Sequence, residues 1–438
     1  MDYQEFIDNE YKKSLEDGYI DQELFDKLNV KRGLRNNNGT GVLVGLTKVS
    51  DVHGYVVKND KKIPDDGHLY YRDVDIYDLA KIDKDAFGYE RTCFLILFGH
   101  LPSEDELNDF KKIISDRYEL PKDFLENIIL RNVSSSVMNH LARAVLSLYS
   151  FDDDPDNTNP KEILRKGINI IAKLPAIVAY SVQSKSHYID NDALHIHNPK
   201  KEYSIAQNLL YLSRNDGLFT DLEAETLDLA LTIHADHGGG NNSTFTNVVV
   251  SSTDTDIYST IAAGICSLKG PRHGGANQKV LDMMYYIIND ISLDATDEEM
   301  HDVVCKLLNK EYFDNSGLIY GIGHAVYTKS DPRCVLLKEK CRELSKQLGD
   351  DTFSFYARFE AIAIAELEKR KGTNYCANVD YYSGLTYRLL NIPRDLFIPI
   401  FACARTVGWV AHIIENKLYC NKIIRPATAY VGNKVKEN

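Results

Sequence analysis

Apolar side chains recur at helical spacing along most of this chain, from about Asp73 onward. In "TDIYSTIAAGICSLKGP", Ile257, Ile261, Ile265 and Leu268 would share one face of a helix, and the following Gly-Pro ends the pattern. The same spacing returns in "ATDEEMHDVVCKLLNK", "TFSFYARFEAIAIAELEKRKG" and "FIPIFACARTVGWVAHIIEN". Alternating strand patterns are scarce, and "GVLVGLTKVSDVHGYVV" is the best candidate for a small sheet. The sequence therefore predicts a mostly α-helical protein.

Length, charge and cysteine usage narrow the class of protein. The 438 residues are enough for two domains, and the net charge of −13 argues against a basic face for nucleic acid or an anionic membrane. The N-terminus lacks the features of a signal or transit peptide, and no run of 18 uncharged apolar residues follows. The eight cysteines form no C-x-x-C pair, so we expect reduced thiols and a cytoplasmic protein.

One histidine stands between a helix-breaking Gly-Pro and two glycines, in "GPRHGGAN". His273 precedes a helix that we expect to begin near Ala276. The positive end of a helix disfavours an imidazolium, so a neutral His273 could donate a hydrogen bond to a developing oxyanion. The alternative is a histidine that caps backbone groups in a tight turn.

A second histidine follows glycines in "YGIGHAVYTKSDPR". His324 comes after Gly321 and Gly323, which let the backbone approach a ligand closely, and Arg333 follows nine residues later. Because the guanidinium fork fits a carboxylate, the histidine and the arginine together indicate a clamp on an oxo-acid. The alternative is a glycine turn with a surface arginine.

Two charged residues lie in apolar surroundings. Burial of Asp380 against Tyr381 and Tyr382 would raise its pKa toward the range of a general base, whereas the simpler interpretation is a cap on a helix near Ser383. Arg405 lies in an otherwise apolar helical run. A buried guanidinium needs an anionic ligand or an acid partner, and Glu415 is one candidate for that partner.

The segment "IHADHGGGNNSTF" raises the question of a metal site at His234 and His237. No third ligand lies at a recognised spacing, and H-E-x-x-H is absent. The phosphate-binding and dinucleotide-binding glycine patterns and the G-x-S-x-G elbow are absent too. We therefore expect no catalytic metal and no permanently bound cofactor, with a metal hydrolase as a minor alternative.

In this order, the motifs resemble those of the citrate synthase family. "GHLYYRDVDIYDLA" and "FGHLPSEDELNDF" look like its early segments, and "HADHGGGNNSTF", "GPRHGGAN", "GIGHAVYTKSDPR", "NVDYYSG", "ARTVGWVAHIIE" and "IIRPATAYVG" follow in family order over nearly the whole chain. The resemblance implies a helical homodimer with a large domain formed by residues 1–274 and 382–438 and a small inserted domain at residues 275–381. It further implies the condensation of acetyl-CoA with oxaloacetate and water to give citrate and CoA, the entry step of the tricarboxylic acid cycle.

The resemblance also assigns roles by motif. Asp380 would remove a methyl proton from acetyl-CoA, His273 would hydrogen-bond the thioester oxygen of the resulting enol, and His324 would polarise the oxaloacetate ketone. The residues that would hold the oxaloacetate carboxylates are His237, Arg333, Arg405 and Arg425 of the partner subunit. Those whose backbone would lie against coenzyme A are Leu318, Ile319, Tyr320, Gly321, Ile322 and Gly323.

Three positions depart from the family pattern. Gly238 stands where many relatives carry an acid, Arg272 where a small or apolar residue is common, and Ile322 where an aromatic or small residue is common. The departures leave open a 2-methylcitrate synthase using propionyl-CoA, because one methylene changes binding by only about 1–3 kcal/mol. A catalytically silent helical scaffold is the alternative from another class, and the presence of all three predicted catalytic side chains argues against it.

Overall fold

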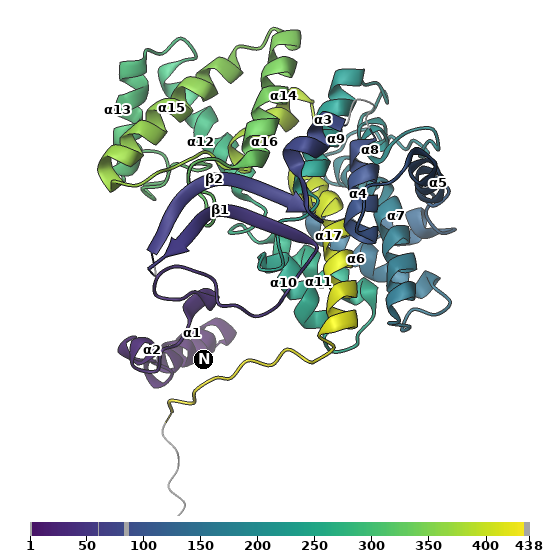
Figure 1. Cartoon of the computed structure of the whole chain (residues 1–438), viewed down its shortest axis with the longest axis horizontal. Coiled ribbons are helices and arrows are strands. Elements are labelled where there is room, and N and C mark those ends of the chain that lie inside the picture. The colour runs from purple at the N-terminus through teal and green to yellow at the C-terminus, as the bar shows by residue number, and fades with distance from the viewer. Residues whose placement is uncertain (1, 60, 83–86, 433–438) are drawn as a thin grey trace, which may run out of the picture. The chain divides into compact units, whose positions relative to one another are not determined.

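Helices make up most of the chain in the computed structural model, as the apolar spacing predicts (Figure 1). The structure describes residues 2–59, 61–82 and 87–432. The helices are α1 (Tyr3–Asp17), α2 (Glu23–Lys27), α3 (Ile76–Ile82), α4 (Gly88–Phe98), α5 (Glu104–Ser115), α6 (Val137–Ser147), α7 (Pro160–Tyr188), α8 (Ile205–Ser213), α9 (Asp221–His234), α10 (Asn242–Ser251), α11 (Ile257–Lys269), α12 (Ala276–Ile291), α13 (Asp297–Leu308), α14 (Pro332–Leu348), α15 (Thr352–Lys371), α16 (Val379–Leu389) and α17 (Phe397–Tyr419). Short turns of helix are η1 (Arg32–Leu34), η2 (Leu125–Leu130), η3 (Leu148–Phe151) and η4 (Arg394–Leu396).

The chain divides into two compact units. The first unit consists of residues 1–45, 59–61 and 424–438, and it contains α1, α2 and η1, none of which has a buried residue. The second unit, residues 46–58 and 62–423, contains the hydrophobic core. The domain boundaries predicted at residues 275 and 381 both lie inside the second unit and stay a prediction.

Helix α17 is the central helix of the second unit and packs against α4, α6, α7, α9, α10 and α11. Small residues allow this close packing. A Cβ atom on Gly408 would lie 2.4 Å from the Asp236 carboxylate, and one on Gly167 of α7 would lie 2.5 Å from Val410. Among the described residues, one helical segment, Arg394–Tyr419, has the length and the apolar composition that could cross a membrane. However, 83% of its most apolar 18 residues are buried inside the fold.

A second group of helices surrounds α16. In this group α16 packs against α12 and α14, and α13 packs against α15. Helix α14 also contacts α9. Helix α14, which carries Arg333, therefore lies next to both α16, which carries Asp380, and α9, which ends just before His237.

The predicted small sheet exists, but its bounds differ from the expectation. Strands β1 (Ser50–Lys58), β2 (Lys61–Tyr71) and β3 (Val74–Asp75) lie in the order β1-β2-β3, with Tyr70 opposite Asp75 in the antiparallel β2–β3 pair. Residues 42–47 are not strand, and the pairing just before them is an isolated antiparallel bridge between Arg35 and Gly41. The sequence pattern missed β2, whose Pro64 and paired aspartates weaken a strand signal.

Candidate active site

Six of the seven side chains predicted to act on substrate lie on elements that meet in the second unit. His237 follows α9, His273 lies between α11 and α12, His324 precedes α14, Arg333 lies in the first turn of α14, Asp380 lies in the first turn of α16, and Arg405 lies in the middle of α17. The charges of Arg333 and Arg405 both influence the pKa values of Asp380 and His237. His237 and Arg405, which are 168 positions apart in the sequence, therefore share one electrostatic environment.

The imidazole ring of His273 contacts the first turn of helix α10. The backbone N–H of Ser243, in the first turn of α10, donates to Nε2 of His273 over 3.4 Å. An Nε2 atom that accepts this proton leaves the hydrogen of a neutral ring on Nδ1. Burial and then the charge of Arg405 lower the pKa of His273 to about 4, so the ring is neutral at pH 7. His273 is therefore a neutral Nδ1–H donor, and α12 begins at Ala276 as expected.

Two backbone N–H groups fix His324 in the Nε2–H tautomer, which is opposite to that of His273. The N–H groups of Val326 and Tyr327 each donate to Nδ1 of His324 over 3.1 Å. The hydrogen of the neutral ring is then on Nε2, which can donate to a substrate oxygen. The ring also stacks on Tyr327, with centroids 4.7 Å apart.

His237 lies edge-on to His324, with ring centroids 5.3 Å apart and an interplanar angle of 89°. Its Nε2 atom is buried and has no hydrogen-bond partner. Burial first, and then the charges of Arg333, His324 and Arg405, lower the pKa of His237 well below its usual range. A neutral ring with an unsatisfied buried nitrogen fits the predicted role of binding a polar substrate group.

The alternative that Asp380 caps a helix near Ser383 is wrong, because the helix begins one turn earlier and Asp380 lies within its first turn. Helix α16 begins at Val379, and its cap is Asn378, whose side chain accepts from the Asp380 N–H. Burial raises the pKa of Asp380 to about 6, more than Arg333 lowers it, although part of the side chain stays accessible. The Tyr381 and Tyr382 hydroxyls bond instead to Tyr356 and Glu360 of α15, because neighbouring side chains diverge by about 100° around a helix.

Arg405 is fully buried, and within the described parts of the chain no acidic side chain forms an ion pair with it. Its Nε donates to the carbonyl of His234 over 2.7 Å, while both Nη atoms are buried without a hydrogen-bond partner. Burial lowers its pKa to about 10. The alternative of an ion pair with Glu415 is wrong, since the Glu415 carboxylate accepts from the Lys48 N–H. Two unsatisfied donors on a buried cation fit an anionic ligand.

Arg333 is buried rather than a surface arginine. It is 4% exposed, and its Nε and one Nη donate to the two oxygens of Asp331 over 3.0 and 2.7 Å. Burial alone would lower the pKa of Arg333, but Asp331 raises it above its usual value. Asp331 is also the cap of α14, accepting from the Arg333 N–H. The D-P-R sequence, a cap followed by proline, could have revealed this pairing partner.

The sequence patterns missed a buried histidine–aspartate pair next to His237. His412 Nε2 lies 3.0 Å from Oδ2 of Asp236, which also accepts from the Ser50 hydroxyl and the Gly238 N–H. Burial alone would raise the pKa of Asp236, but His412 and Arg405 lower it below its usual range. This pair fixes the backbone that carries His237. Only a contact across 176 residues reveals it, so no local signal could have found it.

The glycine loop predicted to lie against coenzyme A is fastened to the segment before Asp380. The Gly323 N–H donates to the Cys376 carbonyl over 2.7 Å, and the Asn378 N–H donates to the Gly321 carbonyl over 2.8 Å. Gly321 has a φ of +83°, and a Cβ atom there would lie 2.8 Å from Val280. Backbone conformation and internal packing therefore require glycine at this position, in addition to the approach of a ligand. A cavity of about 290 Å³ borders this loop, lined by Leu308, Gly317, Leu318, Ile319, Ile322, Leu367, Arg370, Lys371 and Tyr375.

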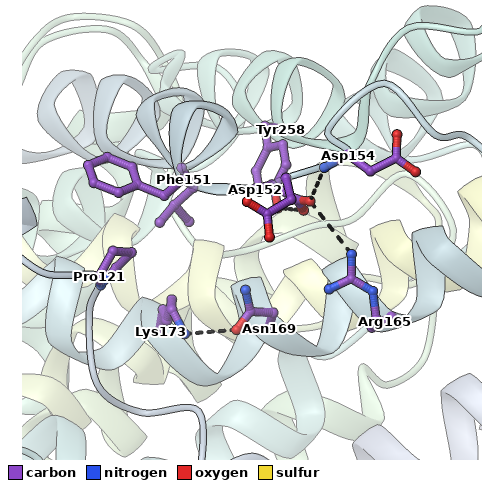
Figure 2. Close-up of a pocket in the computed structure, with 10 residues that line it drawn as sticks. Pro121, Phe151, Asp152, Asp154, Arg165, Asn169, Lys173 and Tyr258 are labelled. Carbon is purple, nitrogen blue, oxygen red and sulfur yellow. Dashed lines mark hydrogen bonds and ion pairs between the residues drawn. The ribbon is translucent and has the colours of Figure 1, made fainter.

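A separate cavity of about 290 Å³ on α7 shares no residue with the predicted site (Figure 2). Its polar groups pair with one another: Lys173 donates to Asn169 over 2.8 Å, and Tyr258 donates to Asp152 over 2.6 Å. Arg165 lies 3.6 Å from Asp152. These mutual pairs leave little for a ligand, and we assign this cavity no catalytic role.

The structure gives no support to a metal ion at His234 and His237. Nδ1 of the buried His234 lies 2.7 Å from the Ala230 carbonyl, to which it donates. Among residues 2–59, 61–82 and 87–432, no other His, Cys, Asp or Glu joins these two histidines closely enough to share an ion. Arg425, the seventh predicted residue, is exposed and belongs to the first unit, so its placement in an active site stays a prediction.

Comparison with known proteins identifies the family. A family model described as the citrate synthase C-terminal domain matches residues 37–427. Citrate synthase of Haloferax volcanii is 33% identical over 416 residues, covering 92% of this chain and 96% of that protein. 2-Methylcitrate synthase of Shewanella oneidensis is 30% identical over 383 residues, covering 83% of this chain and 88% of that protein. The solved citrate synthase of Pyrobaculum aerophilum is 30% identical with a TM-score of 0.76, covering 91% of this chain and 92% of that one. The predicted helical fold is thereby confirmed, and the chain belongs to the citrate synthase family.

Proposed function

We propose that this protein condenses acetyl-CoA with oxaloacetate and water to give citrate and free coenzyme A, as a cytoplasmic homodimer. The observation that carries the proposal is the combination in one cluster of a carboxyl group with a raised pKa, two neutral histidines of opposite tautomer and a buried guanidinium whose Nη atoms have no partner among the described residues. Each of these groups fits one step of the reaction.

Proton abstraction is the first step. Asp380, with a pKa of about 6, is ionised at pH 7 and basic enough to take a methyl proton from the thioester. The Nδ1–H of His273 would donate to the thioester oxygen as the enol forms. A neutral histidine is suited to this role because it stabilises the oxygen without protonating it fully.

Carbon–carbon bond formation is the second step. The Nε2–H of His324 would donate to the ketone oxygen of oxaloacetate, while His237, Arg333 and Arg405 would hold its carboxylates. The enol carbon attacks the polarised ketone, and water then cleaves the thioester of the condensed product, releasing coenzyme A. The cavity beside Leu318 and Ile322 supports a position for coenzyme A next to the glycine loop.

A thiol-release assay tests the reaction and the acyl group together. We expect oxaloacetate-dependent release of free thiol from acetyl-CoA, and slower release from propionyl-CoA. Propionyl-CoA belongs in the assay because the family includes a 2-methylcitrate synthase at 30% identity. A higher kcat/KM with propionyl-CoA would replace the acetyl proposal by the 2-methylcitrate one, and no release from either thioester would contradict both.

Exhaustive chelation should leave kcat unchanged, because the steps above use only carboxyl, imidazole and guanidinium groups. The measurement is the same thiol release before and after removal of metal ions. A chelated enzyme that is inactive and recovers with added zinc would contradict a mechanism without a catalytic metal.

The pH dependence of kcat/KM should report the protonation state of Asp380. The raised pKa means that the base is protonated below about pH 6, so kcat/KM should fall about tenfold per pH unit below that value and be level above it. His273 stays neutral throughout, since its pKa is about 4. A profile without a break between pH 5 and pH 7, measured on stable enzyme, would argue against Asp380 as the base.

Subunit mixing should reveal a shared active site. If Arg425 reaches the site of its partner, an inactive Arg425→Ala subunit and an inactive Asp380→Asn subunit should regenerate activity after exchange, approaching one active site per heterodimer. Each variant alone, treated in the same way, is the control. Demonstrated exchange without recovery would mean that Arg425 serves its own chain or the fold.

A further inference from the structure

Helices α13 and α15, which lie side by side, bring a histidine, a cysteine and a carboxylate together (Figure 1). His301 and Cys305 lie one turn apart on α13, and Glu366 lies opposite them on α15. Among the described parts of the chain, these three form the one set of His, Cys, Asp or Glu side chains close enough to share a metal ion. None of them has a part in the proposed reaction.

The distances between the three donor atoms fit a tetrahedral ion. Nε2 of His301 lies 3.2 Å from Oε2 of Glu366 and 3.9 Å from Sγ of Cys305, and one ligand atom of each residue lies within 4.8 Å of the other two. In a tetrahedral zinc site with bonds of about 2.0–2.3 Å, such donor atoms are about 3.3–3.6 Å apart. A contraction of a few tenths of an ångström between Nε2 and Sγ, with a small movement of the carboxylate toward the sulfur, would complete the set.

The ligand chemistry points to a borderline or soft divalent ion. A thiolate and an imidazole favour zinc over magnesium or calcium, and a thiolate with a carboxylate balances a charge of +2. Cys305 would release its thiol proton to solvent as the ion binds.

Arg370 holds one oxygen of Glu366, Oε1, whereas Lys369 and His301 contact the other, Oε2. Arg370 donates to Oε1 over 2.7 Å and to the side chain of Asn309 over 2.9 Å, so it can stay in place while Oε2 binds the ion. Ligating carboxylates are commonly hydrogen-bonded in this way by a further side chain. Lys369, which is 3.4 Å from Oε2 and has a largely exposed side chain, would move into solvent.

We propose that His301, Cys305 and Glu366 form a binding site for a zinc-type divalent ion, with water as the fourth ligand, which links α13 to α15. The site is separate from the cluster around His273, and its role is to stabilise this part of the fold rather than to take part in catalysis. The proposal is independent of the condensation chemistry.

Cobalt titration of the metal-free protein tests the site directly. Co²⁺ should bind one per chain and give the charge-transfer absorption of a thiolate ligand. Cys305→Ser should abolish this absorption, whereas Cys266→Ser, at an exposed cysteine outside the cluster, should leave it unchanged. Absorption that persists in Cys305→Ser, or no binding to the parent protein, would overturn the proposal.

Zinc affinity and thermal unfolding provide the second measurement. Zn²⁺ should raise the Tm of the metal-free protein, and His301→Ala should weaken binding by at least about 100-fold, because even a partner beyond the ligands contributes about 10–100-fold. Both variants should keep the kcat of the parent. A Tm rise in His301→Ala and Cys305→Ser equal to that of the parent protein would place the ion elsewhere. A failed thiol-release assay would contradict the proposed reaction but would not affect this binding result.

Discussion

Asp380→Asn should lower kcat by about 10²–10⁴ while leaving oxaloacetate binding within a few-fold of the parent. The amide cannot take the methyl proton, but it has nearly the same shape as the carboxylate. The oxo-acid would still be held by His237, Arg333 and Arg405. The measurement is steady-state thiol release together with a direct oxaloacetate titration of the variant.

The same substitution should make the protein more stable at neutral pH. Burial raises the folded-state pKa of Asp380 from 3.8 to about 6, so the ionised carboxyl costs folding free energy that is absent when the group is protonated in both states. The cost grows as pH rises from about 4 to about 6 and then stays constant. After allowance for the accessible part of the side chain, Asp380→Asn should therefore gain about 1–2 kcal/mol above pH 6 and nothing near pH 3.

Urea unfolding at both pH values separates the two effects. A variant with full activity would remove Asp380 from the chemistry. A loss of activity with a loss of stability at pH 7 would instead indicate a structural role, because a desolvated base should cost stability rather than provide it.

Arg405→Met should weaken oxaloacetate binding by about 2–5 kcal/mol, or roughly 30- to 4,000-fold in Kd. Both Nη atoms of Arg405 are buried without partners, and a substrate carboxylate is the group that would satisfy them. Methionine fills similar volume without the charge. The free protein should become about 1 kcal/mol more stable, since the removal of a desolvated cation outweighs the lost bond to the His234 carbonyl.

Arg394→Met is the matched control. Arg394 lies just before α17 and pairs with Asp282 over 2.6 Å, but it is about half exposed. An exposed ion pair is worth about 0–1 kcal/mol, so this variant should keep both stability and oxaloacetate affinity. Oxaloacetate binding by Arg405→Met at the affinity of the parent would show that Arg405 is only a structural cation.

Local patterns in the sequence were enough to predict the positions of several helices. The apolar spacing around Ile257, Ile261 and Ile265 predicted α11, and Gly270-Pro271 predicted its end, because a helix must turn its apolar side to the core and proline cannot continue it. The start of α12 at Ala276 followed in the same way. The small sheet was predicted only in part, because the pairing of β1 with β2 is a contact between strands that no single segment encodes.

The ordered set of motifs around His237, His273, His324, Arg333, Asp380 and Arg405 was also enough to indicate the family, which the comparisons confirm. It could not show how each side chain is held. The Asp236–His412 pair joins residues 176 positions apart, and both histidine tautomers depend on backbone N–H groups whose direction only folding sets.

The sequence by itself determined the helical class, the end of α11, the start of α12 and the residue types available for catalysis, because periodicity and helix-ending residues act over a few neighbouring positions. Only the tertiary structure decided that the Nη atoms of Arg405 are buried without a partner among the described residues, that Arg333 pairs with Asp331, and that burial raises the pKa of Asp380. The physical reason is that desolvation and charge act through space, so the protonation state of a side chain depends on everything folded around it.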